Sequence, residues 1–443
     1  MTSKASRATA LLMLAVAASG CSLINKGPRK TPVVGNRVAV LTAETGADVD
    51  PAVAALPMTL PAAVQNSEWS QPGGNANHSM GNLALGSSLT QAFSVPIGQG
   101  TSLKARLASP PVVAGGHVFT IDTTATVRAF DAQTGAQLWQ SRFGVDRGNE
   151  TSLYGGGIAY DSGRIYATNG LGYVAALDER NGGLIWQVKP GGPLRGSPSV
   201  AYDSVYVMSQ DNQLYSLRTT NGETIWSAAA SLEIAGVFGT ASPAVAQGTV
   251  VAGFSSGELN AFRYENGRAL WQDTLSRTSI TTTSVSSLSD IDAYPVIDNG
   301  QVFSVGQGGR MVALELLSGQ RLWEINIAGI STPWVAGDWV FVVTDEGKLM
   351  SVARNTGRVR WITQLPHFRK EKAKRGLINY SGPVLAGGRL IVVSTAGAII
   401  SVDPTGGAVQ GQTTVGTSIT LAPVVANNTL YVLDDEGRLR AFR

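Results

Sequence analysis

Short runs of alternating hydrophobic and polar residues fill most of this chain, and one strand-turn-strand pattern recurs about every 45 residues. Each copy ends in Ala or Ser, five variable residues, Gly, three variable residues and Trp. The terminal tryptophans are Trp139, Trp186, Trp226, Trp271, Trp323 and Trp361. A related copy from Ser401 to Gly411 lacks the Trp. Repeats of this length, made only of strands and turns, are typical of β-propeller blades.

The first strand of each copy begins at a small residue or a turn. Proline often follows, and it is tolerated where a strand starts. Eight such starts lie near Ser109, Gly157, Ser197, Ser242, Tyr294, Thr332, Gly382 and Ala422. Gly- and Asn-containing turns separate the strands that follow, so each copy predicts a four-stranded antiparallel blade. We therefore predict an all-β fold, an eight-bladed β-propeller, with seven blades as the alternative.

The last copy ends at Arg443, where the other copies turn into their Trp-containing strand. The missing strand is found near the front of the repeat region. Residues 86–91 match residues 135–140 of the first copy, with Thr90 in the place of the Trp. An N-terminal strand would thus complete the C-terminal blade and close the ring, which removes exposed sheet edges.

One Trp per blade at a constant position favours a wedge between adjacent blades over a ligand-binding surface. The aspartates in the same turns, Asp131, Asp178 and Asp403, are expected to be hairpin residues rather than metal ligands. The three histidines, His78, His117 and His367, are far apart in sequence and form no pair with metal-ligand spacing. We predict no metal and no cofactor.

The N-terminus predicts export. Basic residues precede a short apolar run from Ala8 to Ala18, which is too short to span a bilayer and is typical of a signal peptide. It ends in Ala-Ser-Gly-Cys at Cys21, the only cysteine in the chain. We predict a lipoprotein signal peptide over residues 1–20, lipidation of Cys21, a flexible tether over residues 21–65 and the propeller over residues 66–443. The alternative is an ordinary signal peptide with an incidental cysteine.

Composition excludes one class of partner. Lys and Arg number 34 against 31 Asp and Glu, a formal charge of +3, and the basic residues form no large clustered footprint. Nucleic acid binding needs such a footprint, so nucleic acid is not an expected partner.

The repeat resembles the propeller of quinoprotein alcohol dehydrogenases, which implies that an enzyme must be considered. Those enzymes hold the quinone beneath a ring formed by two adjacent disulfide-bonded cysteines, and many add a Cys-x-x-Cys-His haem site. This chain has one cysteine, at the predicted lipid anchor. We therefore expect no enzymatic activity, and a quinone-dependent periplasmic dehydrogenase remains the alternative.

A signal peptide with a lipidation cysteine, a tether and quinoprotein-like repeats together resemble the BamB family of outer-membrane β-barrel assembly lipoproteins. Ser287-Leu288-Ser289-Asp290-Ile291-Asp292 is similar to a Leu-Ser-Asp-Val/Ile-Asp segment of that family. The resemblance implies a scaffold at the outer membrane, facing the periplasm, that binds the POTRA domains of BamA. Its implied clients are nascent outer membrane β-barrel proteins. A propeller that binds envelope polymers is a further alternative.

The same resemblance implies which residues dock. Asp290 and Asp292 would accept from basic groups of the partner, since residues i and i+2 of an extended segment point the same way. A second family segment, an apolar-x-apolar-Arg-Gly run, corresponds to Leu232, Ile234 and Ala235, where Ala stands in place of the Arg. Leu232 and Ile234 are therefore expected as apolar contacts.

The run from Arg369 to Arg375 carries five basic residues and one acidic residue. A solvated loop is the simplest interpretation. Anionic lipid headgroups or an acidic partner surface are the functional alternatives.

Overall fold

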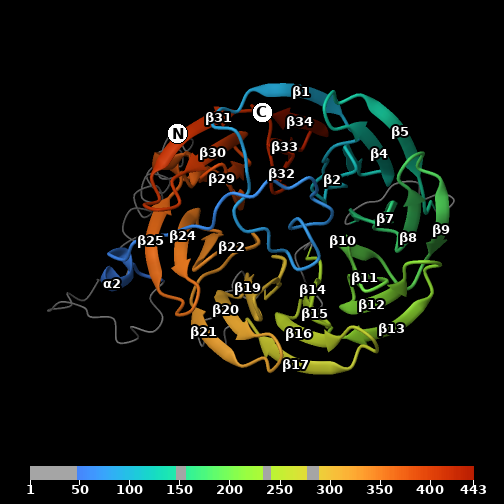
Figure 1. The fold of residues 1–443 in the computed structure, drawn as a ribbon, viewed down its shortest axis with the longest axis horizontal. Helices are drawn as coiled ribbons and strands as arrows, with labels where there is room; N and C mark the ends of the chain where they lie inside the picture. Colours follow the sequence, from blue (N-terminus) through green and yellow to red (C-terminus); the bar gives the residue numbers. More distant parts are fainter. Residues whose placement is uncertain (1–46, 146–155, 233–240, 277–288) are drawn as a thin grey trace, which may run out of the picture. The chain divides into compact units, whose positions relative to one another are not determined.

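The computed structural model describes residues 47–443 except 146–155, 233–240 and 277–288. Within these residues, eight four-stranded antiparallel sheets stand around a common axis as the blades of a closed ring (Figure 1). The predicted all-β, eight-bladed propeller is confirmed. The short helix α2, Pro51–Ala54, and the one-turn η3, Glu371–Ala373, are the helices that the described part of the chain contains.

Each blade runs from an inner first strand to an outer fourth strand. Blades 1 and 2 are β2 (Val112–Ala114), β3 (His117–Ile121), β4 (Thr126–Asp131), β5 (Gln137–Arg142) and β6 (Ile158–Asp161), β7 (Arg164–Thr168), β8 (Val174–Asp178), β9 (Leu184–Val188). Blades 3 and 4 are β10 (Leu194–Ala201), β11 (Ser204–Ser209), β12 (Gln213–Arg218), β13 (Thr224–Ala229) and β14 (Ala244–Ala246), β15 (Thr249–Gly253), β16 (Glu258–Arg263), β17 (Ala269–Thr274).

The second half of the ring follows the same plan. Blades 5 and 6 are β18 (Val296–Asp298), β19 (Gln301–Gly306), β20 (Arg310–Glu315), β21 (Arg321–Ile325) and β22 (Trp334–Ala336), β23 (Trp339–Val343), β24 (Lys348–Ala353), β25 (Val359–Gln364). A small hairpin, β26 (Phe368–Lys370) and β27 (Arg375–Leu377), precedes blade 7, which is β28 (Tyr380–Ala386), β29 (Arg389–Ser394), β30 (Ala398–Val402), β31 (Val409–Thr414). Blade 8 is β32 (Val424–Ala426), β33 (Thr429–Leu433), β34 (Arg438–Phe442) and β1 (Gln91–Pro96).

Antiparallel order gives the ring two different faces. The turns that join first to second strands and third to fourth strands, such as residues 115–116 and 132–136, lie on one face, which we call the turn face. The turns that join second to third strands, together with the connections from one blade to the next, such as residues 97–111 and 365–379, lie on the other, the connection face.

The repeated Trp is the lock between neighbouring blades. Its indole packs on the turn-face glycine of the next blade, for example Trp139 on Gly182 and Trp323 on Gly357. These glycines have positive φ values, 70° at both positions, and a Cβ there would lie within 3 Å of the indole. Each Trp Nε1 also donates to a backbone oxygen of the next blade at 2.6–2.9 Å. The predicted wedge role is therefore confirmed.

The aspartates of these turns act as hairpin residues. The Asp131 carboxylate accepts from the backbone N–H groups of Gln133 and Thr134, and the Asp403 carboxylate accepts from the Thr405 hydroxyl and the backbone N–H of Gly406. Asp178 accepts from the N–H of Arg180.

The N-terminal strand closes the ring as predicted, but the residue in the Trp position is not Thr90. In the other blades the Trp faces the Ala or Ser of the third strand, and here Ala441 faces Phe93. Phe93 packs on Gly135 of blade 1, as each Trp packs on its glycine. Thr90 instead exchanges two backbone hydrogen bonds with Arg443 at the end of the ladder. The Phe93 side chain has no N–H group to replace the indole Nε1. Hydrogen bonds to blade 1 are donated instead by Tyr431 Oη and Arg443 Nη2, both to Ala132 O.

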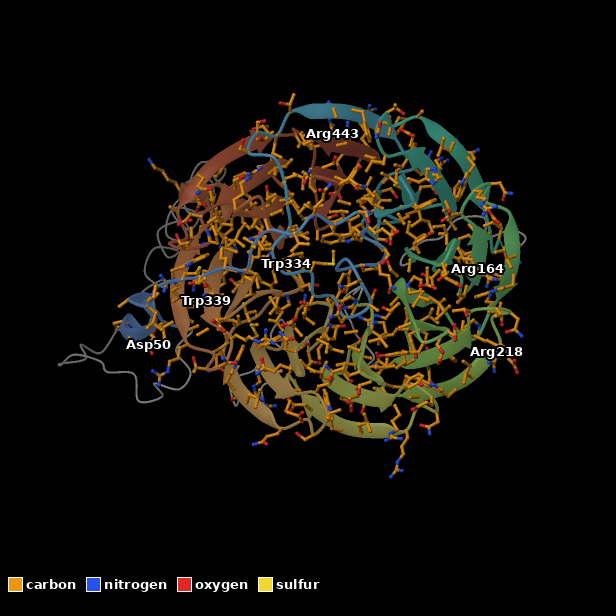
Figure 2. The ribbon with its side chains drawn as sticks, in the orientation of Figure 1. Asp50, Arg164, Arg218, Trp334, Trp339 and Arg443 are labelled. Atoms are coloured by element: carbon orange, nitrogen blue, oxygen red, sulfur yellow. The ribbon has the colours of Figure 1, made fainter. Side chains whose placement is uncertain are left out.

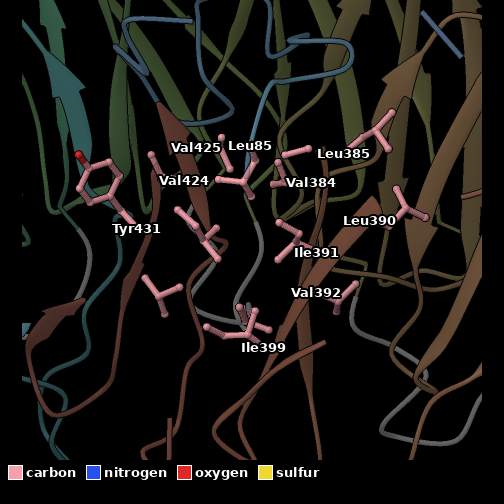
Figure 3. Close-up of a cluster of buried hydrophobic side chains, with 14 of the residues drawn as sticks. Leu85, Val384, Leu385, Leu390, Ile391, Val392, Ile399, Val424, Val425 and Tyr431 are labelled. Atoms are coloured by element: carbon pink, nitrogen blue, oxygen red, sulfur yellow. The ribbon is translucent and has the colours of Figure 1, made fainter. Parts of the chain in front are cut away.

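The missing Trp at position 411 has a structural reason. A Trp of blade 7 would pack on the third turn of blade 8, but β34 and β1 are the two ends of the repeat region and no such turn joins them. Nearer the ring axis, the inner strands of blades 7 and 8 are packed together by buried aliphatic side chains, among them Leu385, Ile391, Val424 and Val425, with Leu85 from the N-terminal segment (Figure 3).

Residues 66–83, which we call the strap, cross the turn face and contact the first strand of every blade. In Figure 1 the strap is the blue trace within the ring. Its hydrogen bonds, from blade 1 to blade 8, join Trp69 to Val113, Ser70 to Tyr160, Gln71 to Val200, Ala76 to Val245, Asn77 to Ile297, Gly81 to Trp334, Leu83 to Leu385 and Asn66 to Val425. The strap thus ties the inner strands of all eight blades together.

Residues 47–64, predicted as the end of the tether, also lie on the turn face. Asp50 N donates to Val359 O, and its carboxylate pairs with Arg358 at 3.2 Å. Asn82 Nδ2 donates to Pro61 O, and Val64 N to Asn82 O. The structure therefore differs from the predicted boundary at residue 65, because ordered contacts with the propeller begin near Val49.

Candidate docking site

A cavity of about 660 Å³ lies on the ring axis. At the turn face it is lined by Trp69 and His78 of the strap, and at the connection face by Arg195, Asp292 and Asp435. Trp69 stacks on Trp334, with ring centroids 6.0 Å apart and planes 18° apart. Figure 2 shows Trp334 near the centre of the ring, whereas Arg218 lies at its rim.

At the connection-face end of this cavity, one arginine meets two carboxylates. Arg195 Nη2 lies 3.3 Å from Asp292 Oδ1 and 3.7 Å from Asp290 Oδ1, and Arg195 Nη1 donates to Ser255 Oγ. We call Arg195, Asp290 and Asp292 the ion cluster. All three side chains are buried, with exposed fractions of 5%, 0% and 7%. Removing one partner from such a buried group leaves an uncompensated charge, which is strongly destabilising.

Local structure explains how Arg195 reaches this position. Most first strands have three or four residues, whereas β10 has eight and starts before the bend that a register shift introduces between Arg195 and Ser199. The additional pairs, Leu194 with Ser209 and Arg195 with Met208, fix the backbone of Arg195 near the ring axis. From there its side chain reaches past blade 4 to the segment that precedes β18.

The electrostatics of the cluster set the protonation of Asp292. Burial raises the pKa of Asp292 to about 7; Arg195 opposes the rise, and the charges of Asp290 and Asp345 add to it. Two carboxylates that share one guanidinium in a buried site disfavour a second negative charge. Asp292 therefore changes protonation near neutral pH.

His78, at the opposite end of the cavity, serves the fold. Its Nδ1 lies 2.7 Å from Pro295 O, and since a carbonyl oxygen only accepts, Nδ1 carries the proton. Burial lowers the pKa of His78 to about 4, so the ring is neutral at pH 7. It packs against Tyr294, with ring centroids 5.3 Å apart.

The structure brings some of the predicted docking residues together and separates others. Asp290 and Asp292 do meet one basic group, but that group is Arg195 of the same chain rather than a partner's, and neither carboxylate is exposed. Leu232 is 74% exposed, on the connection between β13 and β14. Ile234 and Cys21 lie outside the described residues, as does Ala235.

Sequence reasoning missed Arg195. The Arg that is lacking at position 235 has a counterpart in sequence one repeat earlier, in the run Leu194-Arg195-Gly196, which begins the first strand of blade 3. An apolar-Arg-Gly run at the start of a repeat was the available signal. The sequence did not indicate that Arg195 pairs with Asp290 and Asp292, because they lie almost a hundred positions further along the chain.

Within the part of the chain that the structure describes, no group of three or more His, Cys, Asp or Glu side chains has an arrangement that would hold a metal ion. No helix there has the length and apolar character needed to cross a membrane.

Comparison with known proteins places these features in a family. The family model described as outer membrane protein assembly factor BamB matches residues 100–144, 123–363 and 370–443. The outer membrane protein assembly factor BamB of Yersinia pestis is 28% identical over 338 residues, which cover 75% of this chain and 83% of that protein. Its Escherichia coli counterpart is 27% identical over 331 residues, covering 74% and 82%.

Solved structures agree on the fold. The crystal structure of BamB from Moraxella catarrhalis has a TM-score of 0.68 at 18% identity, and the match covers 80% of this chain and all of that one. A europium-containing methanol dehydrogenase has a TM-score of 0.66 at 14% identity, covering 85% and 98%. At these identities the likeness concerns the fold alone, and both an assembly factor and an enzyme share it.

Proposed function

The chain belongs to the family of the outer membrane protein assembly factor BamB, and from that premise we propose that it is a non-enzymatic scaffold of the β-barrel assembly complex. Lipid on Cys21 holds it at the outer membrane, facing the periplasm. There it binds the POTRA domains of BamA and assists the folding and insertion of nascent β-barrel proteins. The family match over most of the chain is the observation that carries this proposal.

We place the docking surface on the connection face, around the ion cluster. Asp292 lines the axial cavity, and Asp290 lies behind it against Arg195. In this arrangement Asp290 positions the segment, and Asp292 is the carboxylate nearer to a partner. Leu232 supplies exposed apolar area on the same face, and Ile234 follows it in sequence. Aliphatic and charged groups side by side are the composition expected of a docking patch.

The single cysteine supports a role without catalysis. Quinoprotein dehydrogenases, which the repeat resembles, use two adjacent cysteines at the quinone. The one cysteine of this chain, Cys21, lies well before the first repeat, at the predicted lipid anchor.

The proposal is tested by titrating the chain from Ser22 to Arg443 into purified POTRA domains of BamA from the same organism, by calorimetry. The wild type is expected to bind. The variant Arg195→Met/Asp290→Asn/Asp292→Asn removes the cluster without leaving a lone buried charge, and it is expected to bind at least tenfold more weakly.

The matched control is Arg354→Met/Asp298→Asn, which removes a largely buried ion pair on the turn face. It is expected to bind like the wild type. Absence of binding by a folded wild type would overturn the proposed function, whereas equal binding by the cluster variant would overturn only the site.

A further inference from the structure

A second feature of the connection face is the hairpin β26–β27, residues 368–377, which we call the basic hairpin. It stands between blades 6 and 7 as a two-stranded sheet of its own, and residues 369–377 are all exposed. Four cations, Lys370, Lys372, Lys374 and Arg375, lie on its tip and its strands. The hairpin therefore presents a compact positive charge to its surroundings.

The hairpin is held in a defined conformation. The Glu371 carboxylate accepts from the backbone N–H groups of His367 and Phe368, at 2.7 and 2.9 Å. Arg369 Nη2 donates to Thr395 O in the β29–β30 turn. At the base, Ile378 N donates to His367 O, and the turn ends at Lys374 in the left-handed conformation, with φ 47°. The segment is thus exposed to solvent, as the simplest interpretation expects, and it is also held in one conformation by these hydrogen bonds.

Its cations are not neutralised within the described part of the chain. None of the ion pairs found there includes Lys370, Lys372, Lys374 or Arg375. The one acidic residue of the hairpin, Glu371, uses its carboxylate on backbone N–H groups. Like charges held close together repel one another, and an external anionic surface would relieve that repulsion.

The position of the hairpin favours a protein over a membrane as that surface. Asn379 and Thr395, at the base of the hairpin, line the same axial cavity as Asp292 and Arg195. Residues 47–64, through which the chain leads toward its N-terminus, lie on the opposite face. A partner seated at the ion cluster would thus meet the hairpin, whereas a membrane that faces residues 47–64 would not.

We propose that the basic hairpin is a second contact of the docking face, and that it binds an acidic surface of the protein that docks at the ion cluster. The inference rests on the proposed function and specifies the chemistry of the partner: carboxylates spaced to meet four cations. Exposed charges of this kind act mainly on the rate of encounter and on its dependence on salt.

The test measures association rates with the POTRA domains at low and at physiological salt, by stopped-flow fluorescence. The variant K370Q/K372Q/K374Q/R375Q is expected to associate about tenfold more slowly at low salt and to lose most of its salt dependence. The control R180Q/R218Q/R263Q/R268Q removes the same number of charges from exposed turn-face arginines, so its net charge is identical. It is expected to keep the wild-type rate and salt dependence.

Three results would overturn the inference. If the hairpin variant and the control associate equally fast, the hairpin does not meet the partner, and the proposed function stands. If phosphatidylcholine vesicles containing phosphatidylglycerol bind the wild type but not the hairpin variant, while POTRA binding is unchanged, the anionic surface is a membrane. If the wild type does not bind the POTRA domains at all, the proposed function fails and this inference with it.

Discussion

The turn face and the connection face are built from the same eight repeats, yet they differ in chemistry. On the turn face, short turns receive the Trp locks, and the strap binds all eight blades through hydrogen bonds. On the connection face, segments of unequal length carry exposed apolar side chains, Leu103, Leu232 and Ile330, together with the ion cluster and the basic hairpin. One face stabilises the ring, and the other is the one that we propose binds the partner.

The reason lies in what each kind of turn must do. A turn between third and fourth strands has to present its positive-φ glycine at one position, because the Trp of the preceding blade packs on it. A connection between blades only has to span the distance from an outer strand to the next inner strand. Its length and composition can therefore vary without breaking a blade, which is where binding residues usually accumulate.

The largest difference between the two faces is expected when Arg195 is replaced. Arg195→Met leaves the buried Asp290 and Asp292 without their cation, and the free energy of unfolding should fall by about 3–5 kcal/mol. Partner binding should be lost as well. Urea denaturation followed by tryptophan fluorescence measures the first effect, and calorimetry the second. In the variant with Asp290→Asn and Asp292→Asn added, stability should recover while binding should not; recovery of both would contradict a docking role for the cluster.

A turn-face variant should show the opposite combination. Trp69→Ala removes a side chain that is 3% exposed and stacked on Trp334, and a loss of about 3–4 kcal/mol of stability is expected. Partner affinity of the folded variant should stay within twofold of the wild type, because the connection face is untouched. The same two measurements apply. A large loss of affinity in protein shown to be folded would mean that the strap contributes to docking.

The two faces should also respond to pH with opposite sign. The pKa of His78 is lowered in the folded state to about 4, so below about 6.5 the unfolded chain binds the extra proton. Acidification from pH 7 to pH 4 should therefore cost about 3 kcal/mol through His78. The pKa of Asp292 is raised to about 7, so the folded chain holds the extra proton, and through Asp292 stability should fall as pH rises from about 4 to 7.

Unfolding midpoints measured across this range separate the two contributions. His78→Gln should weaken the loss of stability on acidification, and Asp292→Asn should weaken the loss on going from about pH 4 to pH 7. The same change of slope in both variants would contradict the assignment.

The smallest effect is expected for Trp323→Phe, a conservative change at a single Trp lock. Trp323→Phe keeps an aromatic ring on Gly357 and loses the hydrogen bond from Nε1 to Arg354 O, which should cost about 1 kcal/mol. Trp323→Ala should cost about 3–5 kcal/mol, since the buried ring is lost too. Thermal unfolding of the pair measures the difference. Equal losses would mean that the ring contributes little beyond its hydrogen bond.

The blades could be predicted from the sequence because each Trp packs on the glycine of the next repeat, and this contact keeps both residues at the same position in successive repeats. Closure by an N-terminal strand followed from the incomplete last copy. The register of that strand could not be predicted. In the other blades a turn joins the third and fourth strands and sets the spacing from Gly to Trp, but no turn joins β34 to β1. Phe93 rather than Thr90 therefore occupies the Trp position.

The docking site was only partly predictable. The i, i+2 spacing indicated that Asp290 and Asp292 point the same way, but not whether they face solvent or a buried arginine. Arg195 joins them from a distant repeat, through an extension of β10 that no periodicity indicates. The contacts of the strap could not be predicted either, because it binds each blade through isolated hydrogen bonds and has no alternating strand pattern.

The claim that the partner binds the connection face is tested most directly by crosslinking in cells. A photo-reactive amino acid would replace Leu103, which is 99% exposed on the connection between β1 and β2, or Leu317, which is 63% exposed on a turn-face turn of blade 5. We expect a crosslink to BamA from position 103 and none from position 317. A crosslink from position 317 alone would place the partner on the turn face, and docking at the connection face would then be wrong.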